Sequence, residues 1–313
     1  MDLALPHLRA LEAVARHGSF SRAAAELGVT QPAVSMQVRQ LEDRLGARLL
    51  ERVGKRAFPT KAGTVLLAHA GRALRELEAG VELVHQMKGV VAGRVRLGTS
   101  ASASIYLLPP AFRRFRAAYP ETELIVVTGN GPDITRAIVD NDLDLGVVSL
   151  PVRERELAVS PFYRDDLVAV GPPGERWPRG GTVTATELAR HPLILFERGA
   201  TLRRLIDGWF ARAHASPGLP MEMGNTEAIK KLVESGLGLS VTSRFSVLAE
   251  LRTRRLTAAR LAPPLVRQIG IVRRRDKPTS PALEAFLATL DRLRPELERS
   301  GGRRPPRPRV SRT

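Results

Sequence analysis

The sequence contains no cysteine, and this absence removes several kinds of chemistry at once. Disulfide bonds, thiolate metal sites and cysteine nucleophiles are excluded, and disulfide use gives no clue to the redox compartment. The apolar runs are too short to span a bilayer. The N-terminal stretch MDLALPHLRALEAVARHG carries acids and bases within an amphipathic pattern, which is not typical of a signal peptide. We therefore expect a cytoplasmic protein without a membrane partner.

Motifs for catalysis, for metal binding and for cofactor binding are also missing. The 6 histidines are scattered, and no HExxH, GxGxxG, Walker loop or nucleophile elbow occurs. Asp142 and Asp144 bracket Leu143 in a loop that enters a strand, where capping and solubility are better explanations than catalysis. The sequence predicts a protein that is not an enzyme and has no catalytic residues, no cofactor and no metal.

Acidic residues are fewer than basic residues. The 49 Lys and Arg against 32 Asp and Glu give a formal net charge of +17, which favours a polyanionic partner through counterion release. Nucleic acid is the first candidate and an acidic membrane the second. Part of the excess lies in residues 299–313, a Pro- and Gly-rich basic segment for which a disordered, solvated end is favoured over a DNA-binding arm. At 313 residues the chain exceeds one compact core, so we expect several structural units.

The first sixty residues predict short helices joined by tight turns. Helical apolar spacing stops at Gly18, segment 21–29 forms a short alanine-rich helix, and Gly28 supplies a turn where the chain must reverse. Thr30 can then cap a second helix over residues 31–45. From this pattern alone, two ordinary surface helices of an all-α domain are the alternative to a DNA-binding helix-turn-helix.

The second of these helices has one apolar and one polar face. Val34, Val38 and Leu41 form the core stripe, and Gln, Ser and Arg side chains lie opposite. Such a helix can enter the DNA major groove, where Gln pairs with adenine and Arg with guanine.

The segment AVARHGSFSRAAAELGVTQPAVSMQVRQLEDRLGARLLER, residues 13–52, closely resembles the LysR-type family of bacterial transcriptional regulators. The resemblance is dense rather than confined to one short motif. It implies an all-α winged helix-turn-helix domain over residues 1–59. The residues that the resemblance places at or near the DNA bases are Gln31, Pro32, Ser35, Met36 and Arg39.

A basic, glycine-containing turn between Leu50 and Phe58 predicts a two-stranded wing that follows the phosphate backbone. Phosphate contacts hold the register of a protein on DNA without reading the sequence. The residues expected to contact the DNA backbone are Ser21, Arg22, Arg52, Lys55 and Arg56.

Residues 60–88 predict a long linker helix that pairs with a second copy. A helix of this length has too little local core to cover its apolar stripe, so pairing is favoured over packing on its own domain. The resemblance implies a homodimer or homotetramer on double-stranded DNA, at an interrupted palindrome near promoters, with RNA polymerase as a partner when the protein activates. The stripe consists of Leu66, Ala70, Ala73, Leu77, Val81 and Val84.

From Gly93 onward, short strands alternate with helices, which predicts an α/β domain with a mostly parallel sheet. The LysR-type resemblance extends to residues 98–126, 142–148 and 225–241 and implies a two-lobed effector-binding domain of the periplasmic-binding-protein type. The expected ranges are 94–298 for the domain, 94–163 with 269–297 for lobe I, and 164–267 for lobe II. The expected strands are 95–98, 123–128, 143–148, 166–170 and 192–196, and the expected helices are 107–120, 132–142, 201–213, 225–236 and 281–293.

Loops 98–104, 147–151 and 197–204 offer glycines and hydroxyls where such sheets bind ligands. Within the family, the chain is most similar to regulators of carbon-fixation and sulfur-assimilation genes, although it reads GATLR where relatives have a GSGTR-like loop. We favour a small anionic metabolite, because an arginine and helix N-terminal amides attract negative charge. Ala101 and Ala103 are expected only to pack. The effector-binding residues implied by the resemblance are Thr99, Ser100, Ser102, Thr128, Ser149, Thr201, Arg203 and Thr226.

Two other functions each explain half of the chain. A pure solute-binding protein accounts for residues 94–298 but not for the basic helix-turn-helix, and a nucleoid-type DNA binder accounts for the charge but not for the two lobes. The sequence as a whole predicts a DNA-binding transcriptional regulator whose activity depends on a small-molecule effector.

Overall fold

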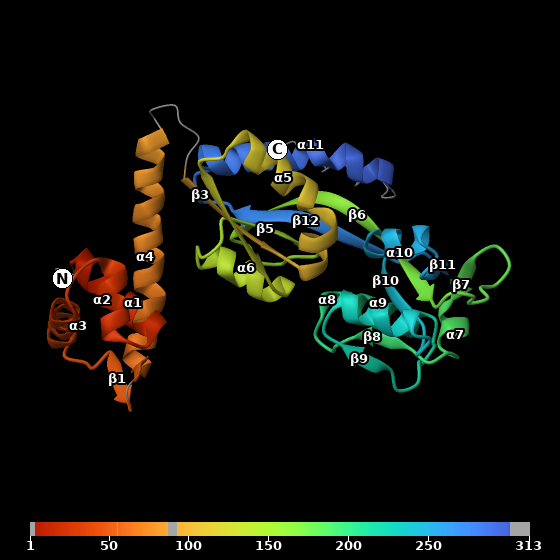
Figure 1. Ribbon diagram of the computed structural model, residues 1–313, viewed down its shortest axis with the longest axis horizontal. Coiled ribbons are helices and arrows are strands. Elements are labelled where there is room, and N and C mark those ends of the chain that lie inside the picture. Colours follow the sequence, from red (N-terminus) through yellow and green to blue (C-terminus); the bar gives the residue numbers. More distant parts are fainter. Residues whose placement is uncertain (1–3, 55, 87–92, 301–313) are drawn as a thin grey trace. The chain divides into compact units, whose positions relative to one another are not determined.

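The computed structural model describes residues 4–54, 56–86 and 93–300, which form two compact units (Figure 1). The first unit ends at Lys88 and the second begins at Gly89. Lys55 and the basic segment from residue 301 onward lie outside the described residues. In the part of the chain that is described, no helix combines the length and apolarity needed to cross a membrane.

The first unit is a three-helix domain with a β-hairpin and a long helix. It contains α1 (Leu5–His17), α2 (Phe20–Leu27), α3 (Gln31–Leu45), the antiparallel hairpin β1 (Leu50–Val53) and β2 (Arg56–Pro59), and α4 (Lys61–Gln86).

Local signals in the sequence set the helix boundaries of this unit. The Ser19 and Thr30 side chains accept hydrogen bonds from the Arg22 and Ala33 amides at the starts of α2 and α3, and each such cap contributes about 1 kcal/mol. α2 ends at Gly28 with φ 66°, a conformation that costs glycine little. One core holds the unit together, with Leu11, Val14, Ala23, Val34, Leu41 and Leu49 at its centre and Ala70 and Leu74 of α4 against it.

The second unit is built on an eight-stranded sheet in the order β4-β3-β5-β12-β6-β11-β7, with β10 paired to β6. The strands are β3 (Gly93–Thr99), β4 (Thr122–Thr128), β5 (Leu145–Ser149), β6 (Leu157–Gly171), β7 (Thr182–Thr184), β10 (Ser240–Ser243), β11 (Thr257–Ala262) and β12 (Val266–Arg274). A separate parallel pair consists of β8 (Ile194–Phe196) and β9 (Met221–Met223).

The expectation of a mostly parallel sheet is wrong. Among the described strands of the eight-stranded sheet, β3 with its two neighbours and β7 with β11 pair in parallel, whereas β5, β6, β10, β11 and β12 are joined by antiparallel pairings. The cause is the long antiparallel ladder between β6 and β12, which the sequence pattern did not reveal. β6 carries three charged residues in its middle, at 164–166, and β12 carries charged residues near both ends, so neither reads as one long apolar strand.

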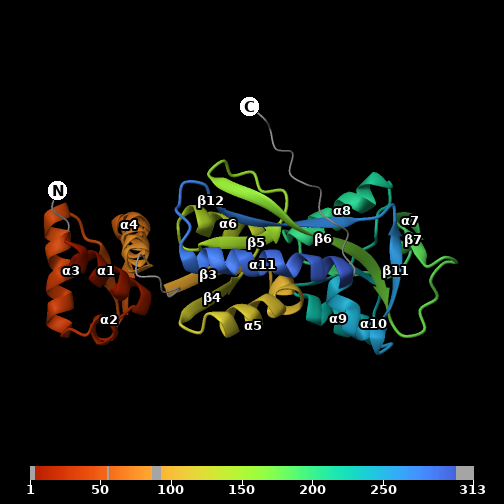
Figure 2. The same ribbon diagram turned by 90° about the horizontal axis from the view of Figure 1, so that it is seen from above.

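Helices cover the sheet in both lobes. They are α5 (Pro109–Ala118), α6 (Gly131–Val139), α7 (Ala185–Leu188), α8 (Thr201–Arg212), α9 (Thr226–Glu234), α10 (Leu248–Arg252) and α11 (Pro281–Ser300), with a π-helical turn η1 (Ala103–Leu107) and a 3-10 turn η2 (Arg244–Val247). α5 and α11 lie side by side (Figure 2), and Phe112 stacks on Phe286 between them with ring centroids 6.5 Å apart.

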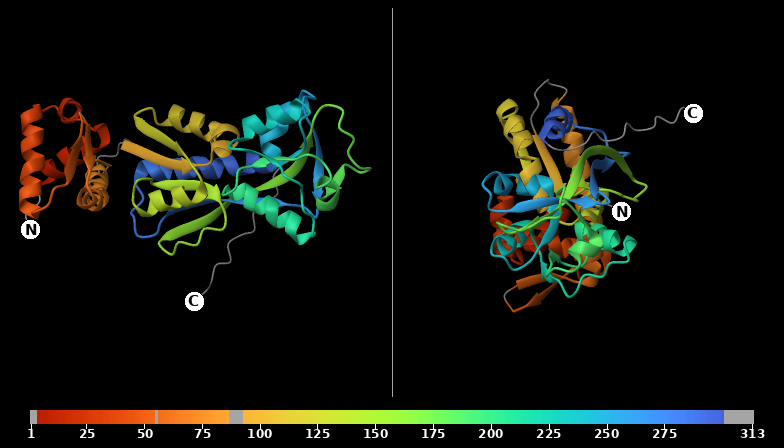
Figure 3. Two further views of the ribbon diagram at one scale, coloured as in Figure 1. Left: turned by 90° about the horizontal axis from the view of Figure 1, so that it is seen from below. Right: turned by 90° about the vertical axis from the view of Figure 1, so that its right-hand side faces the viewer.

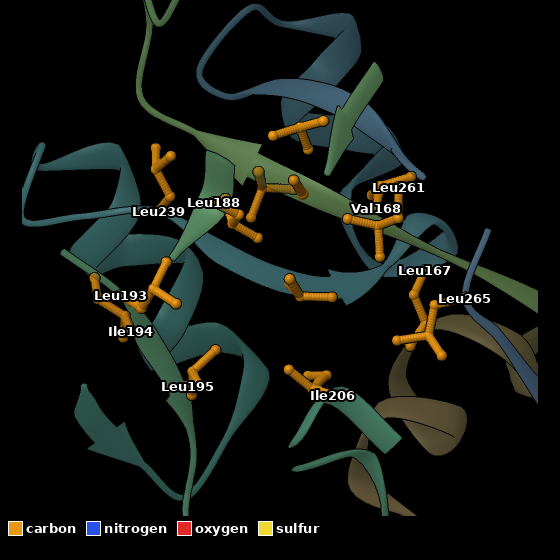
Figure 4. Close-up of a cluster of buried hydrophobic side chains, with 14 of the residues drawn as sticks. Leu167, Val168, Leu188, Leu193, Ile194, Leu195, Ile206, Leu239, Leu261 and Leu265 are labelled. Atoms are coloured by element: carbon orange, nitrogen blue, oxygen red, sulfur yellow. The ribbon is translucent and has the colours of Figure 1, made fainter. Parts of the chain in front are cut away.

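Each lobe has its own hydrophobic core. In the left view of Figure 3, the yellow and dark blue elements of lobe I lie beside the green and cyan elements of lobe II. Tyr163 and Ile269 belong to the lobe I core, and Leu167 and Leu265 belong to the lobe II core (Figure 4). The chain therefore passes between lobes at residues 164–166 of β6 and 266–268 of β12.

Candidate functional site

The polar face of α3 presents the five residues expected to read DNA bases. Gln31, Pro32, Met36 and Arg39 are exposed, and Ser35 is half-buried. Their spacing along the sequence places them on one side of the helix, opposite the buried Val34, Val38 and Leu41. The Gln31 amide donates to Ser35 Oγ at 2.7 Å, which presents one joined polar edge. The Met36 side chain is 56% exposed, so its apolar end can contact a thymine methyl group.

Residues expected to contact the DNA backbone flank α3. Ser21 and Arg22 are exposed in the first turn of α2, and Arg52 and Arg56 are exposed on the two strands of the wing. The Arg52 guanidinium lies 5.1 Å from the centroid of the Phe20 ring, a cation–π contact that holds the wing arginine against α2. The fifth expected residue, Lys55, is outside the described residues.

A second surface of note is the apolar stripe on α4. Leu77, Val81 and Val84 are 52%, 55% and 60% exposed, and Val65 near the start of the helix is 59% exposed. The predicted stripe divides in two, because Ala70 is buried in the unit's own core and Leu66 packs against that core. Ala73 is exposed.

A cleft of about 500 Å³ lies between the two lobes of the second unit. The carboxyl ends of β3, β4 and β5 open onto it from lobe I, and the segments that lead into α8 and α9 face it from lobe II. This is the position at which open α/β sheets bind ligands. Its polar and glycine lining comprises Ser100, Ser102, Thr128, Gly129, Asn130, Gly131, Ser149, Glu197, Arg198, Gly199, Thr201, Gly224, Asn225, Thr226 and Arg267.

Six of the eight expected effector-binding residues line this cleft, and Thr99 and Arg203 do not. Thr99 is fully buried and donates to the Val147 carbonyl at 2.8 Å, so it joins two strands within the sheet. The six that line the cleft are Ser100, Ser102, Thr128, Ser149, Thr201 and Thr226.

Arg203 is buried behind the cleft wall. Its guanidinium donates to the Phe196 carbonyl at 2.6 Å, to Asp207 at 2.8 Å and to Glu222 at 3.1 Å. The hydrogen bond from Arg203, opposed by burial, lowers the pKa of Glu222. Arg203 thus fixes the first turn of α8 to β8 and does not face a ligand in the cleft.

Several lining residues were not expected from the sequence. Ala101 lines the cleft, which corrects its assignment as a packing residue, while Ala103 is buried as expected. Asn130 and Asn225 cap α6 and α9, with side-chain oxygens that accept from the amides of the third helical residues at 3.0 and 2.8 Å. Their signal was present, because Asn before a helix is a standard cap. Arg198 lies in the expected ligand loop 197–204, whereas no comparable signal marks Arg267.

The electrostatics of the cleft favour a negatively charged ligand. The N-termini of α6, α8 and α9 all reach its wall, and each helix carries a partial positive charge at that end. α8 begins at Thr201 after Ala200, which supplies no side-chain cap, so its first amides keep their hydrogen-bonding capacity. Two arginines line the cleft against one acid, Glu197. Both arginines also form ion pairs with acids that do not line the cleft, Arg198 with Glu222 and Arg267 with Asp165. Within the described ranges, no group of three or more His, Asp or Glu side chains could hold a metal ion.

Comparison with known families divides the chain in the same way. Residues 5–64 match the bacterial regulatory helix-turn-helix protein, lysR family, and residues 88–294 match the LysR substrate binding domain. The chain belongs to the LysR family of transcriptional regulators and is not an enzyme.

Individual relatives indicate which group of LysR regulators the chain resembles. The chain is 36% identical to the RuBisCO operon transcriptional regulator of Allochromatium vinosum, over 91% of this chain and 95% of that protein. It is 34% identical to the HTH-type transcriptional regulator CbbR of Xanthobacter flavus, over 92% and 87% of the two chains. The predicted similarity to carbon-fixation regulators is confirmed.

Solved structures show the same fold. Full-length CbnR complexed with its target DNA is similar with a TM-score of 0.70 and 23% identity, over 93% of this chain and 99% of that chain. The regulatory domain of CcmR from Synechocystis PCC6803, in complex with 2-PG, is similar with a TM-score of 0.60 and 27% identity, over 64% and 97% of the two chains. The predicted fold class, a helix-turn-helix domain followed by a two-lobed α/β effector domain, is confirmed.

Proposed function

We propose that this protein binds an interrupted palindrome near promoters as a homodimer or homotetramer, and that a small anionic metabolite in the cleft changes how it contacts DNA. The observation that carries the ligand class is the uncapped N-terminus of α8, which meets two other helix N-termini and two arginines at one cleft. Because its target is chromosomal DNA, we place the protein in the cytoplasm, and when it activates we expect contact with RNA polymerase.

The size of the cleft supports a small ligand. About 500 Å³ is within the range of pockets that enclose metabolite-sized molecules. The structure of CcmR in complex with 2-PG supports the choice of probe. A ligand that touches both lobes changes their relative angle, and a dimer can convert that change into a different spacing of its two recognition helices.

The exposed stripe on α4 supports pairing of two chains. Three large apolar side chains recur at Leu77, Val81 and Val84 on one side of the helix, each more than half exposed. A second copy of this helix would bury them. Two recognition helices separated by about 34 Å, one turn of DNA, would then read a palindrome.

We expect two kinds of DNA-binding variant. Ser35→Ala and Arg39→Ala remove groups from the exposed face of α3 and should change the preferred sequence, with a loss of about 1–3 kcal/mol confined to individual base pairs. Arg52→Ala and Arg56→Ala remove wing cations and should weaken binding to all DNA, with the salt slope reduced by about 1 for each. Titrations of specific and scrambled duplexes at several salt concentrations measure both effects, and an equal loss of specificity in both sets would contradict this division of roles.

The test of the whole proposal is a footprint of the purified protein on the DNA upstream of its own gene and of a RuBisCO operon, with and without 2-PG. We expect an interrupted palindrome whose protection or bend changes as 2-PG is added. If DNA binding stays nonspecific, the regulator assignment to these promoters fails. If specific binding is unchanged with 2-PG, inorganic phosphate and inorganic sulfate at saturation, the proposed anionic effector class fails.

A further inference from the structure

A buried ion pair lies where the chain crosses between the two lobes. Arg267 on β12 is 6% exposed and Asp165 on β6 is 1% exposed, and the two residues are direct partners in the antiparallel ladder. Arg267 Nε and Nη2 both donate to Asp165 Oδ2, at 2.9 and 2.6 Å. The other carboxylate oxygen, Oδ1, accepts from Ser243 Oγ at 2.6 Å. Asp165 is therefore held firmly from both sides.

Arg267 also lines the ligand cleft, although its partner Asp165 does not. Its hydrogen bonds within the described part of the chain use Nε and Nη2, so Nη1 remains available to a ligand. A guanidinium has five N–H donors in a planar fork that suits carboxylate and phosphate groups. Burial reduces screening by water, so a charge-assisted bond to this group is stronger than one at the surface.

The ion pair lies at the junction of the two lobes. Asp165 and Arg267 fall between Tyr163 and Ile269 of the lobe I core and Leu167 and Leu265 of the lobe II core. A ligand group that draws on Arg267 therefore acts at the two strands through which the lobes are joined.

We propose that Arg267 is the residue that binds the acidic group of the effector, a carboxylate or a phosphate, and that Asp165 is the positioning residue that orients it and competes for its charge. This inference rests on the proposed function and deepens it, because it names which cation of the cleft selects the ligand. In the free protein the guanidinium is neutralised by Asp165, and an entering anion shares it.

The proposal predicts opposite effects for the two partners of one ion pair. Arg267→Gln should weaken binding of 2-PG at least tenfold, because the charged donor is lost. Asp165→Asn should strengthen binding several-fold, because the competing charge is removed while a hydrogen-bonding side chain remains. Arg267→Lys should recover part of the loss in affinity. A purely structural pair predicts instead that Arg267→Gln and Asp165→Asn change affinity in the same direction.

Isothermal titration of the full-length protein with 2-PG and with inorganic phosphate measures these affinities. Arg96→Gln is the control, because Arg96 on β3 also forms an ion pair with an aspartate, Asp144 at 3.4 Å, but does not line the cleft; its affinity for 2-PG should stay within about threefold of the wild type. Thermal unfolding followed by circular dichroism verifies that the second unit of each variant folds. If Arg267→Gln does not fold, Asp165→Asn still tests the proposal: a gain in affinity for 2-PG supports it, and no gain overturns it.

Opposite signs for the two variants support the proposal. If the wild type binds 2-PG but both variants lose affinity, or neither changes, the role proposed for Arg267 is overturned. The proposed response to an anion then still stands. A wild type that binds neither anion overturns both.

Discussion

Replacing Gly63 with alanine is expected to destabilise the DNA-binding unit by about 3 kcal/mol or more. A Cβ at this position would lie 1.9 Å from the Leu49 carbonyl oxygen and 2.9 Å from its carbonyl carbon. These are backbone atoms at the entry to the wing, so no side-chain rotation can relieve the overlap. The start of α4 must move away from Leu49, whose side chain is buried in the core of the unit. Urea unfolding followed by circular dichroism measures the loss.

Gly71→Ala is the matched control on the same helix. The atoms nearest to its added Cβ belong to the guanidinium end of Arg75, at 2.9 Å, and a flexible side-chain terminus moves at little cost. Replacement of a mid-helix glycine contributes about 1 kcal/mol in return. We expect stability within about 1 kcal/mol of the wild type, and an equal loss for both variants would show that contact with Leu49 is not the cause.

A charge in the exposed stripe of α4 is expected to have the largest effect on DNA binding. Val81→Glu places a carboxylate among Leu77 and Val84, where the proposed second helix would desolvate it. The protein should become monomeric and lose 100-fold or more in affinity for the full palindrome, because avidity from two linked recognition helices contributes a factor of about 10²–10⁴. Binding to an isolated half-site should be little changed.

Sedimentation velocity and gel shifts on full and half sites measure the two consequences of Val81→Glu together. Glu76→Lys is the control, since Glu76 is exposed on another side of the same helix. A Val81→Glu protein that remains a dimer would contradict the assignment of this stripe as the pairing surface.

The sequence was most informative where local rules decide the structure. Thr30 caps α3 as expected, Gly18 and Gly28 end α1 and α2, and Val34, Val38 and Leu41 separate the buried face of α3 from its polar face. Period and capping are properties of a few neighbouring residues, so they can be inferred without knowing what the segment packs against.

The sequence was least informative where distant segments meet. Asp165 and Arg267 are 102 residues apart, and in the sequence each is a charged residue whose partner cannot be inferred. For the same reason, the sequence pointed to Arg203 as a ligand-binding arginine and not to Arg267. Arg203 follows a glycine-containing loop at a helix start, which is typical of an anion site, yet Glu222 and Asp207 turn its guanidinium away from the cleft.

The two crossings of the chain between lobes also set an order for biosynthesis. Lobe II is built from one continuous stretch between β6 and β12, whereas the lobe I core needs Ile269 and Ile271 of β12 and Phe286, Leu290 and Leu293 of α11. During translation, the segments that form lobe I therefore leave the ribosome in two parts, one before and one after the whole of lobe II. Domains usually fold from the N-terminus onward during translation. Here lobe II can finish folding first, because the core of lobe I is incomplete until α11 has been synthesised.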